Sequence, residues 1–362
     1  MITVTRTSMP PLAEYVAYLE RIWPTAYLTN NGPLCCELAS QLKDCLGVGN
    51  LELVANGTLA LQLAIKALEV RGEVITTPYS YVATTNAILW ESCDPVFVDV
   101  DPQTLCIDPA LIESAITART SAILATHVYG YPCDVDAIQN IADRHGLRVI
   151  YDAAHAFGVK LNGRSLLAHG DCSTLSFHST KLFHCGEGGA VIARTPALSQ
   201  RVFLMTMFGH CGEERYVEIG INAKMSELHA AMGLSVLPRV DDFIARRRHC
   251  SGRYDALLEG LPLHRPKVVA GLDYNYAYYP VLFEDHATMM RVRRALLDHD
   301  IMPRRYFFPS LNTLPFLREA LRRPCPVSED AASRVLALPL SAELEDAEVD
   351  SVVGCLREAL AW

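Results

Sequence analysis

The chain has 362 residues, of which half are hydrophobic and a fifth are charged, and its formal net charge is -9. That length fits one large domain with a smaller one beside it and a sizeable buried core. The acidic balance argues against a nucleic-acid partner, because contacts to phosphates need clustered lysines and arginines.

The first residues, MITVTRTSMPPLAEY, lack the charged start and apolar block of a secretory signal, and no segment is typical of a membrane span. The twelve cysteines are scattered without a C-x-x-C motif, which speaks against a zinc site or a redox dithiol. We therefore expect reduced thiols, no bound metal, no membrane partner and a cytoplasmic location.

Short runs typical of β-strands alternate with helical stretches between residues 50 and 195. This alternation predicts an α/β fold with a mainly parallel central sheet and helices on both faces. Several runs are apolar throughout, as expected for strands covered on both sides. Residues 134–146 predict one of the helices, with Asp134 as its N-cap and Gly146 at its C-terminus. The strand runs are LELVA, EVITTP, PVFVDV, SAILATHVYG, RVIYDA, CSTLSFH and GGAVIA.

The pattern changes after residue 225. A long helical stretch over residues 225–261 contains Pro238, which predicts a kink or a break. Strand and helix patterns beyond it, ending in an amphipathic helix, predict a small α+β domain. We expect a large domain of residues 1–238, including an N-terminal helical segment, and a small C-terminal domain of residues 239–362.

Lys181 follows the run SFHST and precedes the glycine-rich turn GEGG. A lysine in a partly desolvated pocket has a lowered pKa and can act as an amine nucleophile. From this segment alone, an exposed lysine beside a tight turn is an equal alternative.

Four other positions suggest a ligand site. Asp152 ends an apolar strand, where open α/β sheets bind ligands, and it needs a cationic partner unless it only caps a turn. Gly57 and Thr58 begin a helix after a strand, where backbone N–H groups can hold a phosphate. Tyr81 follows another strand and either stacks on an aromatic ligand or belongs to the core. His155 either binds a ligand or is a satisfied core histidine.

Together these features match the parts that hold pyridoxal 5'-phosphate: an amine for a Schiff base, a carboxylate for a pyridinium, a phosphate site and a stacking ring. The chain has no Walker A motif and no G-x-G-x-x-G fingerprint, which speaks against ATP and dinucleotides.

The sequence resembles the sugar aminotransferases of the DegT/StrS type, pyridoxal phosphate-dependent enzymes with the aspartate-aminotransferase fold (fold type I). The resemblance covers nearly the whole chain. It rests on ordered stretches that include ANGTLALQLA, TTPYSYVATTNAI, YDAAHAFG, SFHSTK, GEGGAV, GINAKMSELHAAMG and MPRRYFFP.

The resemblance implies a role for each site residue. Lys181 would form the Schiff base with the cofactor, Asp152 would hold the pyridine nitrogen, and His155 would lie beside the phenolic oxygen. Tyr81 would stack on the ring. The phosphate would be bound by Gly57, Thr58 and Ser176.

Asn222 matches a family residue that reaches the phosphate of the neighbouring subunit's cofactor, which implies a homodimer with shared active sites. A branch of the family has histidine in place of the lysine and acts as a dehydratase. Lys181 therefore favours transamination, with glutamate as the amino donor.

Within the family, the chain looks most like enzymes that aminate C4 of dTDP-4-keto-6-deoxyglucose for surface glycans such as the lipopolysaccharide O-antigen. C3-amination, a UDP-linked keto sugar, another pyridoxal phosphate reaction such as dehydration, and a cofactor-binding regulatory protein without turnover remain alternatives. Residues that could contact the nucleotide diphosphate, unless they form only an exposed basic turn, are Lys224, Arg304, Arg305 and Tyr306.

Overall fold

The computed structural model describes residues 1–361. A seven-stranded sheet forms the centre of its larger part, in the spatial order β2-β10-β9-β6-β5-β3-β4. β10 runs antiparallel to both of its neighbours, and the other neighbouring pairs are parallel, so the predicted α/β fold is confirmed. The strands are β2 (Leu51–Val54), β3 (Glu73–Thr76), β4 (Asp94–Phe97), β5 (Thr120–Thr126), β6 (Arg148–Asp152), β9 (Cys172–Ser176) and β10 (Gly189–Ala193).

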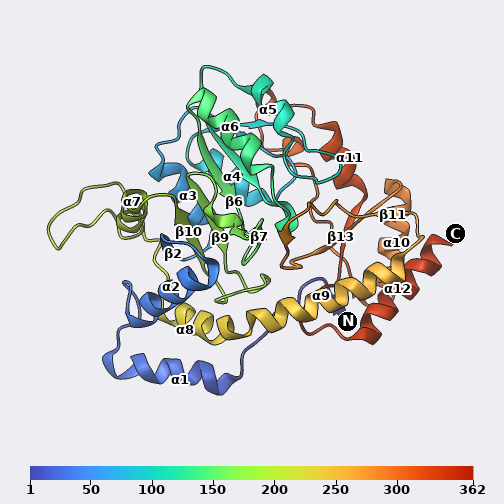
Figure 1. The fold of residues 1–362 in the computed structure, drawn as a ribbon, viewed down its shortest axis with the longest axis horizontal. Coiled ribbons are helices and arrows are strands. Elements are labelled where there is room, and N and C mark those ends of the chain that lie inside the picture. Colours follow the sequence, from blue (N-terminus) through green and yellow to red (C-terminus); the bar gives the residue numbers. More distant parts are fainter. Residues whose placement is uncertain (362) are drawn as a thin grey trace.

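Helices cover both faces of this sheet (Figure 1). Successive residues of β5 show why its run is apolar throughout: Ile123 belongs to one apolar cluster and Leu124 to the other, on opposite faces. The first cluster includes α2 (Pro33–Leu46), α5 (Pro109–Ala115), α6 (Val135–His145) and α8 (Glu227–Val236). The second includes α3 (Gly57–Ala67), α4 (Val82–Trp90) and α7 (Pro196–Thr206).

Two local predictions are confirmed. The Ala137 amide donates a 3.0 Å hydrogen bond to Oδ1 of Asp134, and Gly146 ends α6 with a φ of 65°. Pro238 lies in a 3₁₀ turn, Leu237–Arg239, that separates α8 from α9 (Val240–Leu258). The two helices nevertheless continue in one direction along the molecule (Figure 1).

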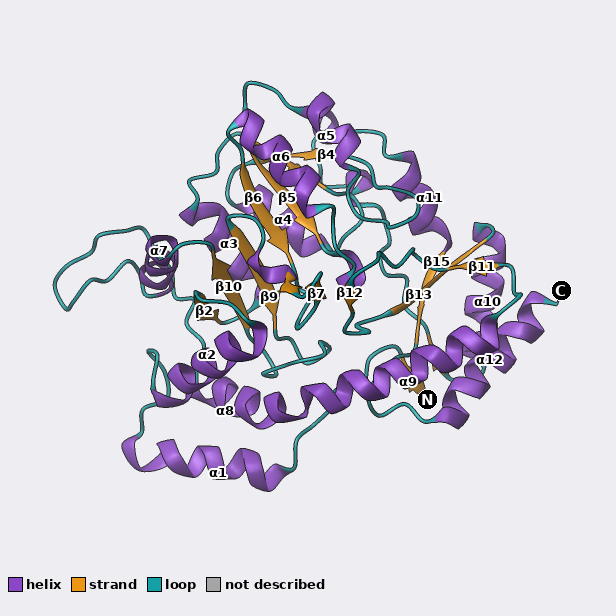
Figure 2. Ribbon diagram, in the orientation of Figure 1, coloured by secondary structure: helices purple, strands orange, loops and turns teal. Residues whose placement is uncertain are grey.

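The C-terminal elements surround a separate apolar cluster that includes α9. Strand β1 pairs in parallel with β14, so the start of the chain joins these elements and both termini lie at one end of the molecule (Figures 1 and 2). The division at residue 238 stays a prediction. The elements around this cluster are β1 (Ile2–Thr3), β11 (Leu263–His264), β13 (Tyr279–Phe283), α10 (His286–Asp298), β14 (Ile301–Met302), β15 (Val335–Leu338) and α12 (Asp346–Leu360). Helix α11 (Pro326–Arg334) instead buries Ala331 and Ala332 in the first cluster of the central sheet.

The remaining α-helix and β-strands of the described chain are α1 (Leu12–Ile22), β7 (Lys160–Leu161), β8 (Arg164–Ser165) and β12 (Leu272–Asp273). Strands β12, β7 and β8 form a small sheet of their own. Within residues 1–361, no helix has both the length and the apolar character needed to cross a bilayer.

Candidate active site

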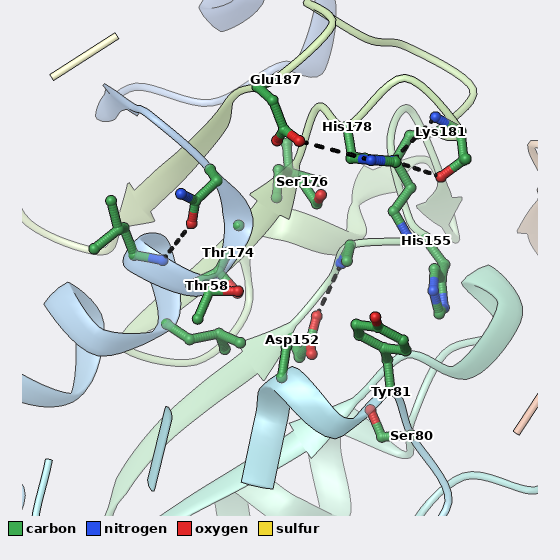
Figure 3. A pocket seen from close by; sticks show the side chains of 18 of the residues that line it. Thr58, Ser80, Tyr81, Asp152, His155, Thr174, Ser176, His178, Lys181 and Glu187 are labelled. Carbon is green, nitrogen blue, oxygen red and sulfur yellow. Dashed lines mark hydrogen bonds and ion pairs between the residues drawn. The ribbon is translucent and has the colours of Figure 1, made fainter. Parts of the chain in front are cut away.

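A cavity of about 820 Å³ opens at the carboxyl ends of the central parallel strands. Asp152 is the last residue of β6, Ser176 is the last of β9, and Gly57 begins α3 after β2. Open α/β sheets bind their ligands at this edge. The cavity brings together most residues predicted from the sequence (Figure 3): Gly57, Thr58, Tyr81, Asp152, His155, Ser176, Lys181, Arg304 and Tyr306.

Lys181 lies half-buried on the loop between β9 and β10. Backbone hydrogen bonds fix this loop, because the Lys181 amide donates to the His178 carbonyl at 2.8 Å and Ser179 donates to Gly186 at 2.9 Å. Burial lowers the pKa of Lys181, and the Asp152 carboxylate partly opposes this shift. The residue therefore differs from an exposed turn lysine, and more of it is the neutral amine at a given pH.

Asp152 is a buried carboxylate at the floor of the cavity. The Thr84 hydroxyl donates a 2.7 Å hydrogen bond to Oδ2, and the Ala154 amide donates a 3.1 Å bond to Oδ1. Burial raises the pKa of Asp152, whereas both hydrogen bonds lower it. No lysine or arginine among residues 1–361 forms an ion pair with this carboxylate, so its geometry suits a cationic atom of a ligand.

His155 is also buried beside the cavity. Its Nδ1 atom accepts a 3.2 Å hydrogen bond from the Tyr129 amide, and its ring stacks on Phe307 at 5.5 Å between centroids. Burial holds the pKa of His155 well below its ordinary value, so the ring is neutral. Because Nδ1 is the acceptor, the ring proton is on Nε2, which is then a donor for a ligand oxygen.

The start of α3 has the features of a phosphate site. Asn56 caps the helix by accepting a 2.9 Å hydrogen bond from the Leu59 amide. Within the described chain, the amides of Gly57 and Thr58 have no hydrogen-bond partner. A Cβ atom on Gly57 would lie 2.7 Å from Cβ of Ser176, so only glycine allows this close approach. The free amides at a helix N-terminus favour an anion.

Tyr81 precedes α4 and is 57% exposed, although it lines the cavity. A core tyrosine would be buried, so this exposure excludes the core alternative. In Figure 3 the ring extends into the cavity near Asp152, where its face is available for stacking on an aromatic ligand.

Three predicted site residues lie outside this cavity. Lys224 donates a 2.6 Å hydrogen bond from Nζ to Oδ1 of Asn222, and both lie in the stretch between α7 and α8. Arg305 points into an adjoining hollow. Asn222 does not line the cavity of its own chain, and its predicted role in a neighbouring subunit's site stays a prediction.

Sequence reasoning missed several lining or supporting residues. Thr84 carries no sequence signal, because only the packing of α4 against β6 brings it to Asp152. Tyr278 and Phe307 stand in the aromatic runs YNYAYYPVLF and RRYFFP, which could have indicated them. His178 and Glu187 also line the cavity, with 3.6 Å between Nε2 and Oε1 (Figure 3).

The observed groups fit pyridoxal 5'-phosphate. An amine with a lowered pKa suits its aldehyde, a buried unpaired carboxylate suits its ring nitrogen, and a neutral Nε2 donor suits its phenolic oxygen. The free amides and the glycine clearance at the start of α3 suit its phosphate.

Comparisons with known proteins agree with this chemistry. Residues 12–357 match the family described as the DegT/DnrJ/EryC1/StrS aminotransferase family. A dTDP-4-amino-4,6-dideoxy-D-glucose transaminase of Shigella dysenteriae is 42% identical over 99% of this chain and 98% of its own length. An enzyme of the same name from Escherichia coli is 40% identical over 95% of each chain. The crystal structure of DesI in the presence of its TDP-sugar product has a TM-score of 0.94 at 34% identity, covering 99% of this chain and 93% of that one.

Proposed function

The chain belongs to the DegT/DnrJ/EryC1/StrS aminotransferase family and is a pyridoxal phosphate-dependent aminotransferase, and we propose that it aminates C4 of dTDP-4-keto-6-deoxyglucose. Glutamate donates the amino group, leaving 2-oxoglutarate and dTDP-4-amino-4,6-dideoxyglucose. The observation that carries the reaction type is the meeting of the Lys181 amine and the Asp152 carboxylate in one cavity. The sugar is inferred from the activity for which the two transaminases that match nearly the full chain are named.

Lys181 has two tasks in this proposal. The cofactor, when bound, supplies an aldehyde carbon and a ring that accepts electrons. The lowered pKa of Lys181 makes Nζ a nucleophile for attachment, and the same atom, when free, takes a proton from the α-carbon of the amino donor and returns one to the product.

The other site residues bind the charged and polar groups of the cofactor. Asp152 favours a proton on the ring nitrogen, and His155 donates from Nε2 to the phenolic oxygen. The amides of Gly57 and Thr58, with the Ser176 hydroxyl, hold the phosphate at the start of α3. Each of these groups acts by orientation and electrostatics, and only Lys181 moves protons.

We also propose that the chain works as a homodimer with shared sites, in the cytoplasm. The segment carrying Asn222 exposes large apolar side chains that a monomer would leave in water, namely Phe208, Tyr216, Ile219 and Ile221. Clustered exposed apolar residues are typical of protein interfaces. A partner subunit on this segment would give Asn222 a route to the partner's cavity, and Lys224 with it.

The decisive experiment supplies the purified holoenzyme with glutamate and dTDP-4-keto-6-deoxyglucose and follows 2-oxoglutarate release. The position and configuration of the new amine are read from the product by NMR. A C3-keto sugar nucleotide and a UDP-linked 4-keto sugar are tested in parallel, and faster turnover of either one replaces the proposed substrate. Binding of the cofactor with no 2-oxoglutarate from any of the three would instead indicate a protein without transaminase turnover.

A further inference from the structure

A second hollow of about 330 Å³ adjoins the active-site cavity. The two spaces are direct neighbours, because both are lined by Ser80, Tyr81, Arg304, Tyr306 and Phe307. We call this space the arginine hollow, because Arg293 and Arg305 also line it.

The arginine hollow concentrates positive charge in a chain whose net charge is -9. Arg293 comes from α10, whereas Arg304 and Arg305 come from the segment after β14. No aspartate or glutamate lines the hollow, and none of the three guanidinium groups has an ion-pair partner in the described chain. Three unpaired positive groups in one concave site repel each other, and a bound anion offsets that cost.

Contacts to the backbone and to Phe308 hold the Arg305 side chain in place at the hollow. Arg305 donates to the carbonyls of Ala332 and Ser333 at 3.3 Å, and its guanidinium lies 3.3 Å above the ring centroid of Phe308. These contacts fix the side chain while its Nε atom remains buried without a partner. Burial lowers the pKa of Arg305, and the positive charge of Arg293 lowers it further, so the two cations affect each other.

We propose that the arginine hollow binds the diphosphate bridge of the sugar nucleotide, with Arg293 as a contact that the sequence motifs did not indicate. The inference rests on the proposed function and deepens it. In this arrangement the sugar lies in the main cavity beside Lys181. The diphosphate extends past Arg304 into the hollow. Guanidinium groups suit this ligand because they donate paired hydrogen bonds to phosphate oxygens.

The test measures binding of dTDP to the holoenzyme by titration calorimetry, for the wild type, Arg293→Ala and Arg293→Gln. The two Arg293 variants should bind dTDP about ten-fold or more weakly, because each loses a charge-assisted hydrogen bond. Arg294→Ala is the matched control, since Arg294 is the next residue of α10 but is exposed and does not line the hollow. It should bind like the wild type. Cofactor absorbance and melting temperature confirm that each variant is folded and loaded.

Unchanged dTDP affinity in a folded Arg293 variant overturns the proposal. An equal loss of dTDP affinity in Arg294→Ala overturns the proposal as well, because any positive charge on α10 would then attract the ligand equally. The wild-type turnover assay is independent: if the enzyme releases 2-oxoglutarate while Arg293→Gln keeps the wild-type KM, only the subsite is wrong. If dTDP binding depends on Arg293 but no keto sugar nucleotide is turned over, the subsite stands and the proposed function falls.

Discussion

The hydroxyl of Thr84 donates a 2.7 Å hydrogen bond to Oδ2 of Asp152, joining the first turn of α4 to the end of β6. Thr84 also pairs with the Ser80 hydroxyl at 2.8 Å, and Thr126 donates to Ser80 at 3.0 Å. A line of three hydroxyl groups therefore leads to the carboxylate. Because the Thr84 bond stabilises the charged form, it counteracts the rise in the pKa of Asp152 that burial causes.

Replacing Thr84 by valine should make Asp152 less effective at keeping the ring nitrogen of the cofactor protonated. The change removes a hydrogen bond to a charged group, worth about 1.5–3 kcal/mol, so turnover should fall about ten-fold or more. The pKa of Asp152 then rises further, and the acid limb of the pH–kcat profile should move to higher pH. Thr84→Ser keeps the hydroxyl and should keep both the rate and the profile.

Thr85→Val provides the matched control, because Thr85 is the next residue of α4 and its buried hydroxyl has no hydrogen-bond partner. This variant should leave the pH–kcat profile unchanged and should not lower stability. An equal shift of the acid limb in the Thr85 and Thr84 valine variants would show that the effect comes from packing and not from Asp152.

Lys181→Ala should abolish covalent attachment of the cofactor. Borohydride reduction followed by peptide mass spectrometry should show the adduct at Lys181 in the wild type and none in the variant. Release of 2-oxoglutarate should fall about a hundred-fold or more, since the proton-transfer group is lost. Lys160→Ala, at an exposed lysine of β7, should match the wild type. An adduct that persists in the Lys181 variant would mean that another amine is the nucleophile.

The pH dependence of cofactor capture tests the environment of Lys181. Burial favours its neutral amine, so the rate at which the apoenzyme captures pyridoxal phosphate should rise with pH and level off below the ordinary lysine pKa. The carboxylate of Asp152 favours the charged amine, so Asp152→Asn should move this inflection to still lower pH. Stopped-flow absorbance measures the capture rate, and hence the pH of the inflection, for the wild type and for Asp152→Asn. An inflection at the ordinary lysine value, or an upward shift in Asp152→Asn, would contradict this account.

The sequence was most informative where local chemistry decides structure. Each of the seven predicted strand runs corresponds to a strand of the central sheet. The antiparallel direction of β10 was not predicted, because GGAVIA contains no signal for direction. The direction follows from the connection: the loop between β9 and β10 has no helix, whereas parallel neighbours need a crossover that usually contains one.

In the active site, too, residues with a local sequence signal could be predicted, and residues positioned by tertiary packing could not. Asp152 ends a strand, Lys181 lies on the loop after a strand, and Gly57 begins a helix. All three could be predicted because these positions lie at the ligand-binding edge of the sheet. Thr84 and Arg293 lie within helices, where their sequence context matches that of ordinary polar positions. Their contacts arise only when α4 and α10 pack near the cavity, so they depend on tertiary structure.

Gly57→Ala should weaken cofactor binding about ten-fold. The added Cβ would lie 2.7 Å from Cβ of Ser176, and relieving such a contact costs about 1–3 kcal/mol. The movement would displace the amides that we expect to hold the phosphate. Gly252→Ala in α9 is the control, because a Cβ there meets nothing within 4 Å. Fluorescence titration of the apoenzymes measures both affinities, and equal values would show that the start of α3 does not bind the phosphate.

Mixed dimers test whether Asn222 acts in the partner's cavity. Lys181→Ala and Asn222→Ala should each be nearly inactive alone, yet a heterodimer of the two contains one site with both residues intact. Random mixing makes half of the dimers heterodimers, so activity should recover to about a quarter of the wild-type value. Lys181→Ala mixed with Asp152→Asn should recover nothing, because both of those residues line the cavity of the same chain. Co-expression with two affinity tags isolates each heterodimer. If the first pair is as inactive as the second, Asn222 does not serve a neighbouring subunit.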